Sequence, residues 1–175
     1  MRYATAFLAG GLCLAAPLPA AAQQASQLST ATRRYVAVAE PVVAITHVTL
    51  IDGTGAAPRT DQTVVIRNGR IAAVGPSGST AVPNGAHTIE GRGHTVIPGL
   101  VGMHDHLFYM AVGGRNVNAQ FTSARLYLAS GVTTVRTTGA NSAYADIQAK
   151  ADIDAGRSPG PRIHLTAPYL TGQGF

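Results

Sequence analysis

The chain has 175 residues, a formal net charge of +5 and a single cysteine. Its basic residues are scattered, and only Arg33 and Arg34 are adjacent. A nucleic-acid surface needs clustered positive charge interleaved with aromatic side chains, so the composition argues against a nucleic-acid partner. The part that follows residue 22 is about 150 residues long, which ordinarily suggests one domain.

Residues 1–22 have the pattern of a signal peptide. Arg2 provides a positive start, residues 4–16 are apolar, and residues 20–22 are three alanines suited to a cleavage site. We therefore expect export to the periplasm or the medium. The apolar stretch is shorter than the roughly 20 residues that span a bilayer, so no stable membrane anchor is expected. Cys13 lies in this segment, which leaves the mature chain without a disulfide or a thiolate metal site.

Residues 23–41 read as a loose lead-in, and residues 42–97 as a small β-module. Asn68-Gly69 is the preferred dipeptide of a type I′ hairpin turn, and it predicts a hairpin between the flanking runs. The expected strands of the module are 42–50, 63–67, 70–74, 86–90 and 94–97.

His104-Asp105-His106 is the main candidate for chemistry. Side chains alternate along a strand, so on a strand both imidazoles project to one face and Asp105 to the other. The apolar run 96–101, broken at Pro98-Gly99, predicts a buried strand approached through a tight turn. Two neutral imidazoles can hold one divalent metal at about 2.0–2.1 Å per nitrogen. Taken alone, the same pair also fits two strand histidines that face a polar cleft and bind nothing.

After His106 the pattern changes to alternating strands and helices. Such alternation predicts parallel βαβ units. Gly131 and Gly156 are placed to end the two helices, and Ser142 to begin the second one. The expected elements are a loop over 107–116, a helix over 118–130, a strand over 132–136, a loop over 137–141, a helix over 142–155 and a strand over 162–166.

The segment 98–107, Pro-Gly-Leu-Val-Gly-Met-His-Asp-His-Leu, resembles the first-strand signature of the metal-dependent amidohydrolase superfamily. The resemblance implies an α/β fold in which residues 42–97 belong to a composite β-sandwich. Residues 98–175 would then be the first three βα units of an incomplete (β/α)8 barrel, which typically needs about 250 residues. Further segments, 45–55, 63–75 and 131–136, resemble the family's lead-in and follow-on in the usual order, so that the resemblance covers residues 44–170.

The resemblance implies that His104 and His106 bind one or two divalent metals, commonly zinc. Such a metal lowers the pKa of bound water to about 7, and the hydroxide attacks a polarised carbonyl. The expected reaction is hydrolysis of an amide, lactam or dipeptide-like C–N bond in a small molecule. A catalytic zinc needs three protein ligands, and the family takes the others, and its proton-handling aspartate, from later strands. The chain alone is therefore expected to be inactive, and no catalytic residue beyond the metal ligands is identified.

Other side chains near the pair have two interpretations each. Asp105 is expected either to face the helices as a carboxylate outside the metal ligands, paired with an arginine, or to make only local contacts. Arg136 contacts a substrate carboxylate or orients the metal loop, or it forms a structural ion pair. Tyr109 and Phe108 line the cleft mouth or pack under the loop. His164 is a packed polar residue or a further ligand. The histidines of the β-module and its exit, His47, His87 and His94, are expected to be surface or hydrogen-bonded residues.

The alternative function is a non-catalytic binding or structural fragment that pairs with another chain. An exported metal-scavenging protein is a third interpretation, which two histidines and no mature cysteine support weakly. A homo-oligomer is compatible with the sequence, but nothing in it indicates one.

Overall fold

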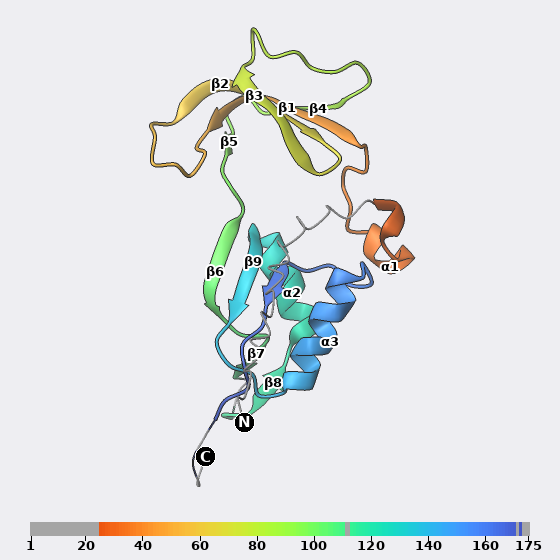
Figure 1. The fold of residues 1–175 in the computed structure, drawn as a ribbon, viewed down its shortest axis with the longest axis vertical. Helices are drawn as coiled ribbons and strands as arrows, with labels where there is room; N and C mark the ends of the chain where they lie inside the picture. The colour runs from red at the N-terminus through yellow and green to blue at the C-terminus, as the bar shows by residue number, and fades with distance from the viewer. Residues whose placement is uncertain (1–24, 111–112, 171, 173–175) are drawn as a thin grey trace, which may run out of the picture.

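A computed structural model describes residues 25–110, 113–170 and 172 (Figure 1). The predicted signal peptide lies outside these residues. The described chain is a mixed α/β structure with a β-module, followed by a parallel sheet that carries two helices. Within the described ranges, no helix has the length and apolar character needed to cross a membrane.

The β-module is a five-stranded sheet in the order β3-β2-β1-β4, in which β5 also pairs with β1. β1 buries every second residue from Ala44 to Leu50, as expected for a strand with one covered face. The predicted strands are present, with β2 beginning earlier than expected, at Arg59. The bounds are β1 Val42–Leu50, β2 Arg59–Arg67, β3 Arg70–Pro76, β4 His87–Glu90 and β5 Thr95–Val96.

The predicted hairpin at Asn68-Gly69 is confirmed. β2 and β3 are antiparallel and pair up to Arg67 and Arg70. Asn68 and Gly69 have φ values of 51° and 73°. Positive φ at both central residues is the signature of a type I′ turn, whose twist matches that of the strands.

The second sheet has the order β10-β9-β6, and all three strands are parallel. Its strands are β6 Leu100–Asp105, β9 Val132–Thr137 and β10 Arg162–His164, and its helices are α2 Gln120–Ala129 and α3 Ala143–Asp154. α2 connects β6 to β9, and α3 connects β9 to β10. As predicted, a glycine at positive φ follows each helix, Gly131 at 80° and Gly156 at 69°. Ser142 is at the N-cap position of α3, but its side chain makes no capping hydrogen bond.

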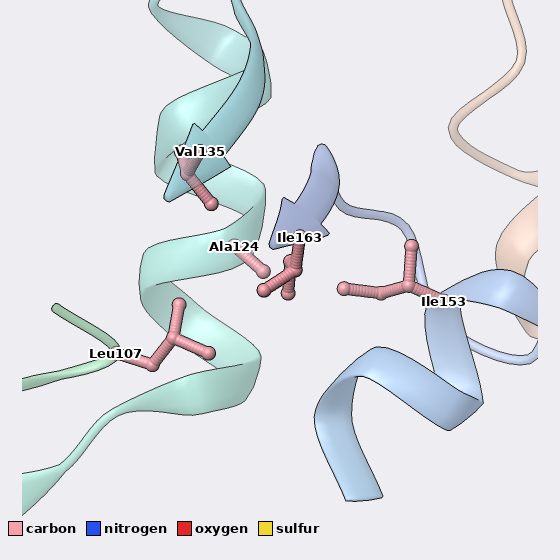
Figure 2. Close-up of a cluster of buried hydrophobic side chains, with 5 residues drawn as sticks. All are labelled: Leu107, Ala124, Val135, Ile153 and Ile163. Atoms are coloured by element: carbon pink, nitrogen blue, oxygen red, sulfur yellow. The ribbon is translucent and has the colours of Figure 1, made fainter. Parts of the chain in front are cut away.

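The core of this part lies between the sheet and the two helices. Val135 and Ile163 of the strands meet Ala124 of α2 and Ile153 of α3, with Leu107 below them (Figure 2). The other face of the sheet is open in the described chain.

The expected buried strand over 96–101 is wrong in two respects. β5 ends at Val96 and β6 begins at Leu100, so the run is divided between two sheets. Val101 is also 58% exposed. An apolar run favours a strand but does not say which of its faces is covered, and here the described helices cover only the opposite one.

Two segments expected to be irregular contain regular structure. The loop predicted over 107–116 includes β7 Phe108–Met110, which pairs antiparallel with β8 Asn116–Asn118. The lead-in contains a short 3-10 helix, η1 Ala25–Gln27, and one helical turn, α1 Thr30–Arg33. The Ser29 hydroxyl caps α1 by accepting from the Thr32 amide, and the Ser29 amide donates to Gly156. Such short elements are fixed by contacts with the end of α3, which periodicity does not reveal.

Candidate metal centre

His104 and His106 lie at the carboxyl end of β6. His104 belongs to the strand, whereas His106 follows its last residue, Asp105, so the expectation of one strand bearing both residues was wrong for His106. The cause is an irregularity: Gly102 pairs with Val135 and Asp105 with Thr137, so β6 has one residue more than β9 over this stretch. The two imidazole rings nevertheless lie together, with centroids 5.5 Å apart and an interplanar angle of 86°.

The spacing of the rings fits two ligands of a shared ion. A zinc ion at about 2.0–2.1 Å from one nitrogen of each ring requires centroids on the order of 5 Å apart. His104 is exposed and His106 half-buried. Within the described ranges, no group of three or more His, Cys, Asp or Glu side chains is placed to hold a metal. The residues present therefore fit part of a ligand set, and the role of the two histidines stays a prediction.

The backbone and ring of His106 are held by several neighbours. The Tyr127 hydroxyl donates to the His106 carbonyl at 3.0 Å. Phe108 and Tyr169 lie beside the ring, with centroid distances of 4.9 and 6.3 Å. Nε2 is 3.5 Å from the Thr138 hydroxyl, at the limit of a hydrogen bond. Nδ1 is buried and has no hydrogen-bond partner in the described part of the chain.

Asp105 faces the helices. It pairs in register with Thr137, which is fully buried, and its carboxylate lies where a side chain of Gly102 would be. The pKa of Tyr127 on α2 is raised, first by burial, then by Tyr109 and by the Asp105 carboxylate. Asp105 Oδ2 is buried without a hydrogen-bond partner among the described residues, so the expected arginine partner is not found at this atom.

Arg136 and His164 lie opposite each other in β9 and β10, and both are exposed. The Arg136 guanidinium reaches across to β6 and donates to the Met103 carbonyl at 3.4 Å, next to His104. His164 is not packed in the described chain, contrary to one of its two interpretations.

Tyr109 lies in β7 and is 48% exposed. Its hydroxyl is hydrogen-bonded to the hydroxyl of Tyr127, which in turn holds the His106 carbonyl. Tyr109 is therefore linked to the histidine loop through Tyr127.

The sequence interpretation missed Asp146. This residue lies in the first turn of α3 and is only 2% exposed. Burial raises the pKa of its carboxyl, while a hydrogen bond from Gln120 and the charge of His106 act in the opposite direction. The Gln120 amide donates to Oδ1 at 3.0 Å, and Oδ2 is buried without a partner among the described residues. An acidic residue in a first helical turn that follows the carboxyl end of a strand was the available signal.

The histidines of the β-module form local hydrogen bonds or ion pairs, as expected. His47 Nδ1 is 2.6 Å from Asp61, and His87 Nδ1 is 3.5 Å from Glu40. His94 Nδ1 is 3.2 Å from the Arg92 carbonyl. These contacts account for all three without a metal.

Comparison with known proteins gives a consistent set of hydrolases. A curated imidazolonepropionase of Stenotrophomonas maltophilia is 38% identical over 63 residues, which are 36% of this chain and 16% of that protein. A solved putative prolidase from Bifidobacterium longum is 36% identical with a TM-score of 0.62, covering 76% of this chain and 32% of that one. Phenylurea hydrolase B is 38% identical with a TM-score of 0.63, covering 73% and 30%.

The chain resembles the N-terminal portion of the amidohydrolase superfamily. No protein-family model matches it. A solved Xaa-Pro dipeptidase, 26% identical with a TM-score of 0.64, covers 74% of this chain and 34% of that one. The chain thus spans about a third of the length of these solved amidohydrolase-like structures, and 16% of the curated relative. The similarity establishes a mixed α/β fold related to an enzyme family of hydrolases.

Proposed function

We propose that this chain is the N-terminal part of an exported, metal-dependent hydrolase of C–N bonds in small molecules. In this proposal His104 and His106 are ligands of one divalent metal ion, with zinc the first candidate. The observation that carries it is the pair of imidazole rings 5.5 Å apart at the carboxyl end of a parallel strand. Export rests on the signal-peptide pattern of residues 1–22.

The parallel sheet and its helices suit the start of a (β/α)8 barrel. β6, β9 and β10 with α2 and α3 would form its first βα units, and residues 42–97 its accompanying β-module. Active sites of such barrels lie at the carboxyl ends of the strands. This is the end at which His104 and His106 lie, so fold and candidate ligands support the same site.

When bound, the metal would supply a water of lowered pKa and polarise a substrate carbonyl. His104 and His106 would hold it, and the Tyr127 hydroxyl would fix the His106 backbone through its 3.0 Å hydrogen bond. Phe108 would exclude water from one side of the His106 ring. Two ligands are fewer than the three of a catalytic zinc, so we expect the 175-residue chain to be inactive by itself.

The names of the similar structures suggest which substrates to test. They include prolidase, Xaa-Pro dipeptidase, molinate hydrolase and phenylurea hydrolase. Arg136 would orient a substrate carboxylate, since its guanidinium is exposed on the same face of the sheet as His104. We therefore place carboxylate-bearing amides, such as Xaa-Pro dipeptides, ahead of phenylureas.

The test uses the gene product at its full encoded length. Bound metal is measured by elemental analysis, zinc affinity by competition with a chelator, and hydrolysis with Xaa-Pro dipeptides, N-acyl amino acids and phenylureas. We expect the double substitution His104→Ala, His106→Ala to weaken zinc binding by more than about 100-fold and to abolish hydrolysis, since even outer-shell partners contribute 10–100-fold. The control is His94→Ala, which removes an imidazole bound to a backbone carbonyl of the β-module. Unchanged metal content in the double variant would rule the proposal out.

One observation favours the alternative of a non-catalytic fragment that pairs with another chain. Val101 and Met103, two residues apart on one face of β6, expose 58 and 62% of their surface. Exposed apolar side chains that form a patch are typical of surfaces that another segment covers. The alternative predicts a full-length product that contains no stoichiometric metal and hydrolyses none of the substrates tested.

A further inference from the structure

Three buried polar atoms near the candidate metal centre have no hydrogen-bond partner among the described residues: Oδ2 of Asp105, Nδ1 of His106 and Oδ2 of Asp146. Asp105 Oδ2 lies against Gly102, so the relevant pair is Nδ1 of His106 and Oδ2 of Asp146. Buried polar groups are nearly always hydrogen-bonded, and a lost partner costs about 1–3 kcal/mol. The two atoms are complementary, because a neutral imidazole can donate from Nδ1 and a carboxylate oxygen accepts.

The Asp146 carboxylate is positioned by its own neighbours. It projects from the first turn of α3 and is 2% exposed. Gln120, at the start of α2, donates to Oδ1 at 3.0 Å and so fixes the orientation of the carboxylate. The remaining oxygen is thereby left for a different donor. The residue before Gln120, Ala119, donates its amide to the Leu107 carbonyl at 3.0 Å, which places the start of α2 and the Asp146 carboxylate beside the residue that follows His106.

The other groups around His106 do not serve Nδ1. Phe108 and Tyr169 contribute aromatic rings. Thr138 lies on the Nε2 side of the ring, and its contact of 3.5 Å is long for a hydrogen bond. The Asp105 carboxylate lies against Gly102 and influences Tyr127.

We propose that Asp146 is a positioning residue that accepts a hydrogen bond from Nδ1–H of His106 through one ordered water. This inference rests on the metal site proposed above and deepens it. The contact holds His106 in the neutral Nδ1–H tautomer and leaves Nε2 available to bind the metal. Metal-ligating histidines generally donate their second ring nitrogen to such an acceptor, and losing it costs 10–100-fold in metal affinity.

The first measurement is the tautomer of His106 in the metal-free, full-length gene product. Multiple-bond ¹H–¹⁵N NMR of histidine-labelled protein at about pH 8, above the ordinary imidazole pKa of about 6.5, distinguishes the two neutral tautomers. The His106 signals are those that disappear in His106→Gln. We expect the Nδ1–H tautomer in the wild type and a shift toward Nε2–H in Asp146→Asn and Asp146→Ala. A wild-type His106 in the Nε2–H tautomer would overturn the proposal even if both variants failed to fold.

The second measurement is zinc affinity by chelator competition. Asp146→Asn should bind zinc about 10–100-fold more weakly, while Asp154→Asn, on the same helix and paired with Lys150 at the surface, should bind as the wild type does. Wild-type tautomer and affinity in Asp146→Asn would refute the role of Asp146 and leave the metal site standing. Unchanged zinc binding in the His104→Ala, His106→Ala variant would instead refute the metal site. The tautomer of His106 would then still show whether Asp146 accepts a hydrogen bond from its Nδ1–H.

Discussion

His106 and Leu107 are consecutive residues whose side chains enter different environments. The His106 ring lies beside His104 at the end of β6, whereas Leu107 is fully buried in the core between the sheet and the helices. The Leu107 carbonyl also accepts a hydrogen bond from the Ala119 amide at 3.0 Å. Leu107 thus anchors the backbone that carries the candidate ligand.

Replacing Leu107 with Ala should destabilise the protein by about 2–5 kcal/mol, because it removes buried methyl groups and leaves a cavity. The free energy of unfolding in urea measures the change. Leu126→Ala on α2 is the matched control, since Leu126 is 61% exposed and its loss should change stability by no more than about 0.5 kcal/mol. Equal losses in the two variants would contradict the described core.

The sequence was sufficient to single out His104 and His106 but not their surroundings. The pair is recognisable because its members are two positions apart in a characteristic segment. Asp146 is separated from His106 by β7, β8, α2 and β9, and it reaches the end of β6 through the contact between the starts of α2 and α3. The burial of Asp146 depends on Gln120 and on the arrangement of the two helices, and the hydrophobic periodicity of the sequence predicts neither.

At the scale of elements, local signals predicted well where a single residue fixes the backbone. Asn68-Gly69 gave the hairpin, and Gly131 and Gly156 gave the helix ends, because each needs a positive φ. The extra residue in β6 before Asp105 was not predictable, since it arises from pairing with β9. The same holds for the β7–β8 ribbon, whose strands are only three residues long.

Replacing Gly69 with Ala should destabilise the β-module by about 1–2 kcal/mol, because an L-residue pays a steric cost at φ 73°. Denaturation in urea, monitored by circular dichroism, checks the change. Gly78→Ala is the control: its φ is not in the positive range, and no atom lies within 4 Å of the added Cβ. If Gly69→Ala were as stable as Gly78→Ala, the turn at Asn68-Gly69 would not be of type I′.

At the scale of the whole molecule, the parallel sheet has two very different faces. Val135 of β9 points into the helix-covered core and is fully buried, while Val101 of β6 is 58% exposed. The open face carries Arg136 of β9 and His164 of β10 beside Val101 of β6. Because apolar residues of β6 occur on the uncovered face, the apolar run indicated a strand but not which face is covered. The exposed face is also the face of His104 and Arg136, so the candidate chemistry and the uncovered apolar surface coincide.

The same substitution, Val to Thr, on each face of the sheet tests this difference through its effect on the free energy of unfolding. Val135→Thr places a hydroxyl among the apolar side chains of Leu107, Ala124 and Ile163 and should cost about 1–3 kcal/mol in unfolding free energy. Val101→Thr keeps the β-branched shape on an exposed strand and should change stability by no more than about 0.5 kcal/mol. Urea denaturation of both variants of the 175-residue chain, with light scattering to detect association, provides the comparison. A large loss in Val101→Thr would mean that the open face is packed in solution, and it would favour the fragment that pairs with another chain over the arrangement described for the single chain.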